Sequence, residues 1–108
     1  MKVYNKLVRD KIPAIIEADG KICEVEIASK EEIASKEEMT KLLEDKLKEE
    51  VNEYLEDKNL EELADVMEML FGLAYNLGYS EEDLIKKRKN KLEERGGFKD
   101  GVVLRVVK

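Results

Sequence analysis

The chain contains no histidine, no tryptophan and a single cysteine, Cys23. One cysteine cannot form an internal disulfide, which fits a reducing compartment. Without histidine it also lacks an imidazole partner for nucleophilic catalysis, so we interpret Cys23 as a structural thiol. No apolar run approaches the ~20 residues that span a bilayer, and the first residues do not have the layout of a signal peptide. These absences predict a cytoplasmic protein with no membrane partner.

Charge and length narrow the class of protein further. Charged residues make up 43% of the 108 residues, apolar residues another 43%, and the formal net charge is −6. A negative chain is a poor match for a nucleic-acid polymer or an anionic lipid surface. The length suits one domain and no change in composition marks a boundary, so we expect residues 1–108 to form a single domain.

The spacing of apolar residues predicts a mainly α protein. Helical periodicity covers residues from about 36 to 56 and from 60 to about 76, and the short turn between them makes these helices an antiparallel hairpin. A third helix begins after Ser80 and ends at Gly96. Pro13 marks the first turn of a shorter helix near the N-terminus.

Two short segments are rich in β-branched residues. Residues 22–28 and 102–107 permit a small two-stranded ribbon beside the helices. Between the first segment and the hairpin, Ser29 and Ser35 are two candidates for the N-cap of the long helix. The helix over 60–76 is apolar almost all round, so we expect a second copy to cover part of it, in a homodimer or larger homo-oligomer.

Two pairs of carboxylates fall on the apolar stripes of the hairpin. Glu50 and Glu53 lie three residues apart on the first helix, as Glu62 and Asp65 do on the second. Folding about the turn brings the four together between two apolar faces, at a cost of several kcal/mol per uncompensated ion. We identify no lysine or arginine on these arcs near the cluster, so a bound divalent cation is the simplest counter-charge.

The type of donor atom limits which metal ion the four acids can bind. Oxygen donors alone favour Mg²⁺, with Mn²⁺ or Ca²⁺ as alternatives. A ferritin-like di-iron site needs Glu-x-x-His, which a chain without histidine cannot supply. Against a metal site, acids are abundant on any solvated face of this chain, and Glu62 is placed to complete a capping box with Asn59.

Basic residues gather in two places despite the negative net charge, which favours an anionic ligand such as phosphate. One group forms a face of the third helix and the other surrounds Pro13. The alternative is that the first group only complements the helix dipole and the second is solvated. The candidate phosphate-binding residues are Arg9, Lys11, Arg88, Lys91 and Arg95, with Lys6 beside the first two.

Four motifs stand in one order along the chain: YNKLVRDKIP from Tyr4 to Pro13, EExxE from Glu49 to Glu53, ExxD from Glu62 to Asp65, and RGGF from Arg95 to Phe98. In this combination the chain resembles MazG-like and phosphoribosyl-ATP pyrophosphohydrolase-like proteins of the all-α nucleoside triphosphate pyrophosphatase superfamily. The resemblance covers nearly the whole chain.

The resemblance implies Mg²⁺-dependent hydrolysis of a nucleoside triphosphate, ribo or deoxy, to the monophosphate and pyrophosphate, as in nucleotide-pool house-cleaning. By position, Glu50, Glu53, Glu62 and Asp65 match the metal ligands, and Glu49 or Glu53 takes the proton of the attacking water. It also implies a homo-oligomer. Two other functions stay open: hydrolysis of phosphoribosyl-ATP itself, and a non-enzymatic helical module for interaction or regulation.

Overall fold

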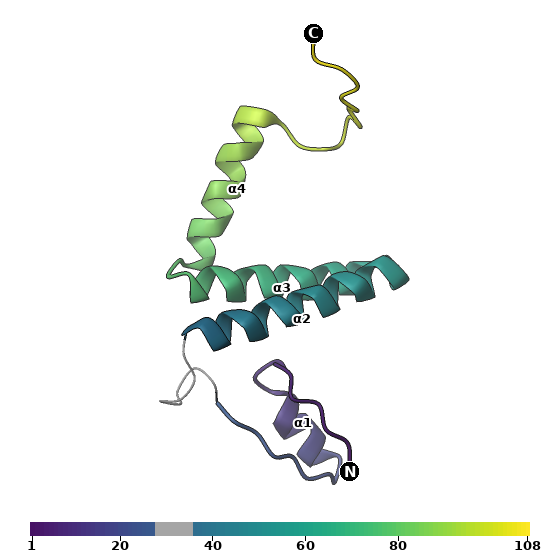
Figure 1. Cartoon of the computed structure of the whole chain (residues 1–108), viewed down its shortest axis with the longest axis vertical. Helices are drawn as coiled ribbons and strands as arrows, with labels where there is room; N and C mark the ends of the chain where they lie inside the picture. The colour runs from purple at the N-terminus through teal and green to yellow at the C-terminus, as the bar shows by residue number, and fades with distance from the viewer. Residues whose placement is uncertain (28–35) are drawn as a thin grey trace.

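A computed structural model describes residues 1–27 and 36–108 of the chain. The helices in this part are α1 (Ile12–Ala18), α2 (Lys36–Asp57), α3 (Leu60–Asn76) and α4 (Glu81–Arg95). Helices α2 and α3 lie side by side as a hairpin (Figure 1). The predicted all-α class and hairpin are therefore confirmed, with helix bounds close to those expected from the periodicity.

Only two residues join α2 to α3, and both have a defined role in the turn. Lys58 adopts a left-handed conformation (φ 48°), and its amide donates to the carbonyl of Tyr54 at 2.7 Å. Asn59 is the N-cap of α3, where its side-chain oxygen accepts the amide of Glu62 at 2.9 Å. A connection this short and well bonded forces the two helices to run antiparallel.

The core of the described residues is small and lies between α2 and α3. Leu43 of α2 and Met69 and Ala74 of α3 are its buried apolar residues. Gly72 allows the helices to approach closely, because a Cβ at that position would lie 3.5 Å from the Leu43 side chain. Most of the stability of the fold must therefore come from this single helix pair.

Helix α3 ends and α4 begins through two well-formed caps. After α3, Gly78 has a positive φ of 95° and the amide of Tyr79 returns to the carbonyl of Ala74 at 2.9 Å, as in a Schellman motif. Ser80 and Asp83 then form a reciprocal capping box at the start of α4. Their hydrogen bonds hold the pKa of Asp83 below its usual value. These caps direct α4 away from the hairpin (Figure 1).

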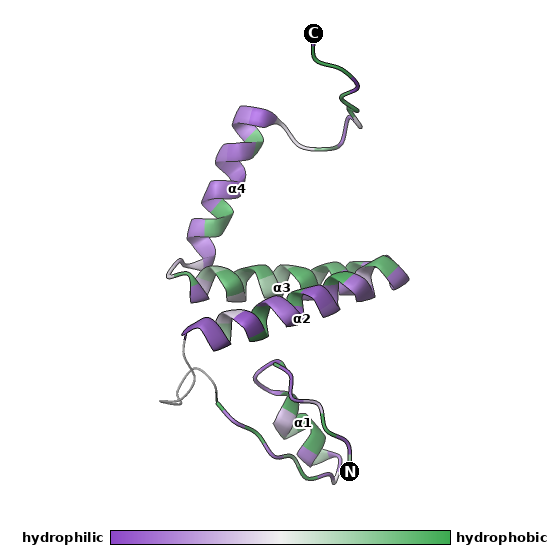
Figure 2. Ribbon diagram, viewed as in Figure 1, coloured by the Kyte–Doolittle hydropathy of each residue, from purple (hydrophilic) through white to green (hydrophobic). Residues whose placement is uncertain are grey.

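A large apolar surface stays in contact with solvent. Figure 2 shows α3 as hydrophobic along most of its length, while α2 and α4 are largely hydrophilic. Leu63, Met67 and Leu70 recur at helical spacing on α3 and are 47%, 55% and 44% exposed. These three residues define the α3 apolar face. No other helix of the described residues covers this face in the single chain, so it stays exposed to solvent.

The β ribbon is not formed in the described part of the chain. Residues 22–27 and 102–107 contain no strand, and Figure 1 places the N-terminal region and the C-terminal tail at opposite ends of the molecule. A composition rich in β-branched residues was therefore not sufficient, because the two segments do not meet to pair. Residue 28 and the candidate N-caps Ser29 and Ser35 lie outside the described residues.

No helix in the described ranges combines the length and the apolar character that crossing a membrane requires.

Candidate metal centre

The four carboxylates predicted to converge do so. Glu50 and Glu53 from the C-terminal half of α2 meet Glu62 and Asp65 from the first turns of α3, and one oxygen from each lies within 4.8 Å of the others. Glu50 is buried, with 8% of its surface exposed, and the other three are partly buried. Four oxygen donors at this spacing form a group that can hold a metal ion.

Two oxygens of this cluster are buried without a hydrogen-bond partner in the described structure: Oε2 of Glu50 and Oε2 of Glu62. Glu62 was also a candidate for the capping box of α3. Its amide is capped by Asn59, but its side chain joins the carboxylate cluster instead of returning to the cap. Buried oxygens of this kind need a counter-ligand, which a cation supplies and a local helix cap does not.

The charges within the cluster repel one another. The neighbouring charge of Glu50 raises the pKa of Glu53, and burial adds to the shift. Burial also raises the pKa of Glu62, together with the charges of Asp65 and Asp57. Both shifts disfavour the ionised carboxylates, so a cation bound among them would relieve an existing electrostatic strain.

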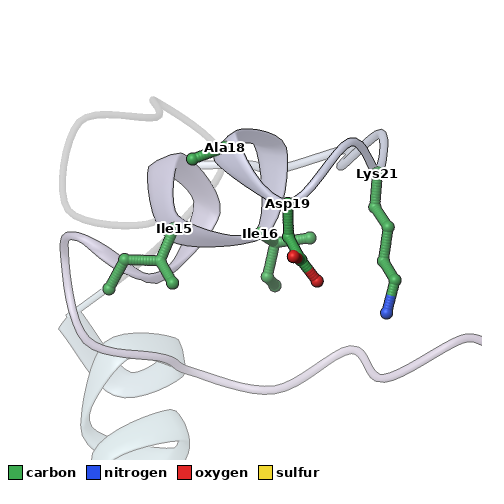
Figure 3. A pocket seen from close by; sticks show the side chains of 5 residues that line it. All are labelled: Ile15, Ile16, Ala18, Asp19 and Lys21. Carbon is green, nitrogen blue, oxygen red and sulfur yellow. The ribbon is translucent and has the colours of Figure 1, made fainter.

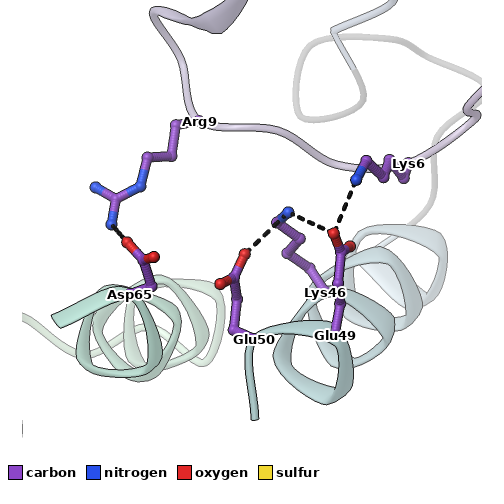
Figure 4. Close-up of polar contacts among 6 residues, drawn as sticks. All are labelled: Lys6, Arg9, Lys46, Glu49, Glu50 and Asp65. Carbon is purple, nitrogen blue, oxygen red and sulfur yellow. Dashed lines mark hydrogen bonds and ion pairs between the residues drawn. The ribbon is translucent and has the colours of Figure 1, made fainter. Parts of the chain in front are cut away.

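One cation at the cluster was missed by the sequence analysis. Lys46 Nζ lies 3.0 Å from Oε1 of Glu50 and 3.3 Å from Oε1 of Glu49 (Figure 4). Burial works to lower the pKa of Lys46, but the hydrogen bond and charge of Glu50 outweigh it and the pKa is raised. The expectation that no lysine lies near the cluster was wrong. The helical spacing contained the signal, because Lys46 follows the core residue Leu43 by three positions.

The N-terminal segment supplies two more cations. Lys6 Nζ lies 2.8 Å from Oε1 of Glu49, and Arg9 Nη2 lies 2.7 Å from Oδ1 of Asp65 (Figure 4). The hydrogen bond from Lys6 lowers the pKa of Glu49, the opposite direction to Glu53. Arg9, predicted to bind phosphate, therefore lies beside the cluster and contacts a candidate metal ligand.

The charges in this region do not balance. The carboxylates are the four of the cluster and Glu49, and the cations that pair with them in the described residues are Lys6, Arg9 and Lys46. With every group ionised, these five carboxylates outnumber the three cations, and Asp57, whose charge also raises the pKa of Glu62, adds to the negative excess. The lysines and the arginine thus reduce the need for a metal ion without removing it.

The other predicted phosphate ligands lie elsewhere. Arg88, Lys91 and Arg95 are exposed on α4, whose only helix contact in the described residues is with α3. Figure 1 shows α4 leaving the hairpin at the end where α3 finishes, whereas the carboxylates lie near the end where α3 begins. Lys11 is exposed at the start of α1 and forms no ion pair in the described part. The single chain brings none of the four to the cluster.

Two of the hollows on the surface of the described residues are shallow, and the four carboxylates line neither. One lies beside α1 and is bounded by Ile15, Ile16, Ala18, Asp19 and Lys21 (Figure 3). The other lies where α2 begins and α3 ends, between residues such as Leu43, Gly72 and Tyr79. The first includes one acid, Asp19, and the second includes no acid, so neither brings carboxylates together as the cluster does.

No protein-family model, characterised protein or solved structure matches this chain. The resemblance to MazG-like proteins therefore depends on the four motifs alone, and the site must be interpreted from its own geometry.

Proposed function

We propose that the protein is a Mg²⁺-dependent nucleoside triphosphate pyrophosphohydrolase. The observation that carries the proposal is the convergence of four carboxylates with two buried, unpartnered oxygens, those of Glu50 and Glu62. An all-oxygen donor set suits Mg²⁺, or Mn²⁺ in its place, and Mg²⁺ sites on carboxylates commonly serve phosphorylated substrates.

The acids of the site have two roles in the proposed reaction, metal binding and proton transfer. Glu50, Glu53, Glu62 and Asp65 would hold the ion, which when bound supplies positive charge for the phosphate oxygens and lowers the pKa of water. Water attacks the α-phosphorus, the bond to the α–β bridging oxygen breaks, and pyrophosphate leaves. Glu49 or Glu53 accepts the water proton.

Glu49 differs from Glu53 in that it is not one of the four converging residues. Two lysines, Lys6 and Lys46, hold its carboxylate at the edge of the cluster, where it orients the attacking water. Lys6 and Arg9 lie beside the cluster and would stabilise the negative charge that grows on the phosphates.

A second copy of the chain belongs to the proposal. The α3 apolar face, formed by Leu63, Met67 and Leu70, is exposed in the single chain and is suited to pairing with its own equivalent. The basic face of α4, with Arg88, Lys91 and Arg95, also lies away from the cluster of its own chain. A homodimer would cover the first and leave the second available for substrate.

A substrate panel tests the reaction class. Purified protein is incubated with Mg²⁺ and each ribo- and deoxynucleoside triphosphate, and both pyrophosphate and monophosphate are measured. We expect the two products in equal amounts, abolished by EDTA and reduced by orders of magnitude in Asp65→Asn. Release of inorganic phosphate instead of pyrophosphate would exclude cleavage at the α-phosphorus.

Two alternatives are tested in the same experiment. Phosphoribosyl-ATP is included in the panel, and turnover of that compound alone would assign the protein to its hydrolysis. The non-enzymatic module is favoured by one observation, the partial neutralisation of the acids by Lys46 and Arg9 without a metal. No product from any nucleotide, with no change in melting temperature on adding Mg²⁺ or Mn²⁺, would support the module.

A further inference from the structure

We propose that Arg9 is an exchangeable counter-ion, which a divalent cation displaces from Asp65 and which then binds the substrate phosphates. The inference rests on the proposed function and adds an order to it, in which the metal ion binds first and the N-terminal arm closes on the nucleotide second. The N-terminal arm is defined as residues 1–11, which precede α1.

The arm is attached to the hairpin in a way that permits exchange. Its ion pairs with the hairpin in the described structure are Lys6 with Glu49 and Arg9 with Asp65. The Arg9 side chain is 55% exposed and that of Asp65 is 31% exposed, so water screens the pair. Helix α1, which follows the arm, makes no helix–helix contact with α2 or α3 among the described elements. Figure 4 shows the arm crossing over the carboxylates with both cations directed down toward them.

Arg9 and a metal ion cannot use Asp65 in the same way. The guanidinium donates to Oδ1 of Asp65, one of the four residues whose oxygens converge. A divalent cation at the cluster would compete for the oxygens of that carboxylate and repel the positive guanidinium. Arg9 therefore neutralises Asp65 before the metal ion binds and becomes free afterwards.

Lys46 provides the contrast that identifies Arg9 as the mobile cation. Its side chain is 13% exposed and starts from α2 itself, one turn before Glu50. Because its backbone is fixed in a helix that forms the core, its ammonium stays within reach of the cluster. Lys6 is intermediate, because it belongs to the arm but pairs with Glu49, which is not one of the four converging ligands. Lys6 thus keeps the arm close while Arg9 changes partner.

The released arginine has the right chemistry for a triphosphate. A guanidinium presents a planar set of donors that binds two phosphate oxygens at once, and it stays charged at any physiological pH. A nucleotide seated on the cluster would bring its phosphates to the position from which the arm departs. The same residue that stabilises the metal-free site would then hold the substrate.

The test compares Mg²⁺ affinity with nucleotide affinity in Arg9→Ala. Calorimetric titration with Mg²⁺ in the absence of nucleotide should show binding about two- to fivefold tighter than in the wild type. The substitution removes the competing guanidinium, and this ratio corresponds to the interaction free energy of an exposed ion pair. At saturating Mg²⁺ the KM for the preferred nucleotide should rise about tenfold, as for a lost charged phosphate contact. Lys21→Ala, which removes a positive charge from beside α1, is the matched control and should change neither value.

A spectroscopic readout follows the exchange directly. In protein labelled with nitrogen-15, the Nε–Hε resonance of Arg9 should shift on addition of Mg²⁺ and shift again on addition of a non-hydrolysable triphosphate. Unchanged or weaker Mg²⁺ binding in a folded Arg9→Ala variant overturns the exchange, since a purely structural contact would lower both affinities together. If the wild type binds no Mg²⁺ at all, the proposed function fails as well, and this outcome separates the two.

Discussion

The ammonium of Lys46 lies 3.0 Å from Oε1 of Glu50, one helical turn further along α2, and the two side chains are only 13% and 10% exposed. A largely buried ion pair is costly to break, because the remaining partner keeps its desolvation penalty. Here the remaining partner would be Glu50, which already shares its surroundings with three other carboxylates. Lys46 is therefore the internal counter-charge that allows the hairpin to fold before any metal ion binds.

Lys46→Met should destabilise the metal-free protein. We expect a loss of about 1–3 kcal/mol in the free energy of unfolding, between the values for exposed and buried pairs. Urea denaturation in EDTA measures this loss, and saturating Mg²⁺ should recover part of it. Lys48→Met, an exposed position two residues along the same helix, is the control. Equal stability of the two variants would contradict the role assigned to Lys46.

Glu62→Gln should separate stability from metal binding. Glu62 has a buried, unpartnered oxygen and no cationic partner among the described residues, so removing its charge should raise the melting temperature in EDTA. The same change removes a metal ligand, so Mg²⁺ affinity should fall about tenfold or more. Loss of a group that only hydrogen-bonds to a ligand already has an effect of this size. Glu61→Gln, exposed and adjacent, should have neither effect. A lower melting temperature in Glu62→Gln would show that its charge is already compensated.

The pH dependence of the metal-free protein follows from the raised pKa values of Glu53 and Glu62. A carboxyl group with a higher pKa in the folded state binds its proton more tightly there than in the unfolded chain. Its stabilising contribution is complete below the ordinary value of 4.5 and is lost as the pH rises through the raised pKa. In EDTA, the melting temperature should therefore increase as the pH is lowered from 7 toward 5.

Glu49 limits this effect at the acid end. Its pKa is lowered, chiefly by Lys6, so its contribution to stability is present above 4.5 and disappears as the pH falls through the lowered pKa. Melting curves recorded across this range should thus show a maximum on the acid side of neutrality. Saturating Mg²⁺ should remove the rise between pH 7 and 5, because the ion replaces the proton as the counter-charge. A melting temperature independent of pH in EDTA would mean that the carboxylates do not repel one another.

Met67→Lys should produce a monomer. Met67 lies between Leu63 and Leu70 on the α3 apolar face. In a symmetric dimer each subunit would bury one lysine charge at this position, so the desolvation penalty would be paid by both copies. Sedimentation velocity would measure the assembly, with Val25→Lys as a control at an exposed apolar residue away from that face. A wild-type protein that is monomeric at all accessible concentrations would refute the proposed assembly.

The helices and the four converging acids were accessible from the sequence because both depend on spacing within single helices. The periodicity gave α2 and α3 nearly their observed bounds, and a turn of two residues left one arrangement for the hairpin. Glu50 and Glu53 then had to face Glu62 and Asp65. Local rules of this kind require no knowledge of distant contacts.

The counter-charges were harder to predict, for two reasons. Lys46 was not counted on the arcs near the cluster, although a lysine can bury its stem and direct its ammonium to a carboxylate. The pairs of Lys6 with Glu49 and Arg9 with Asp65 join residues 43 and 56 positions apart, which periodicity cannot detect. The ribbon over 22–28 and 102–107 was proposed from the β-rich composition of both segments, which carries no information about where two segments lie in space.

Asn59 links the architecture of the hairpin to its chemistry. Its side chain starts α3 by accepting the amide of Glu62, so one hydrogen bond sets the height at which both acids of α3 stand opposite those of α2. The position of the N-cap at residue 59 therefore helps to set the register of the two helices. An extra residue inserted within α3 between Asp65 and Met69 would turn both acids by about 100° relative to the buried face of the helix and carry them out of reach, even if the protein remained fully helical.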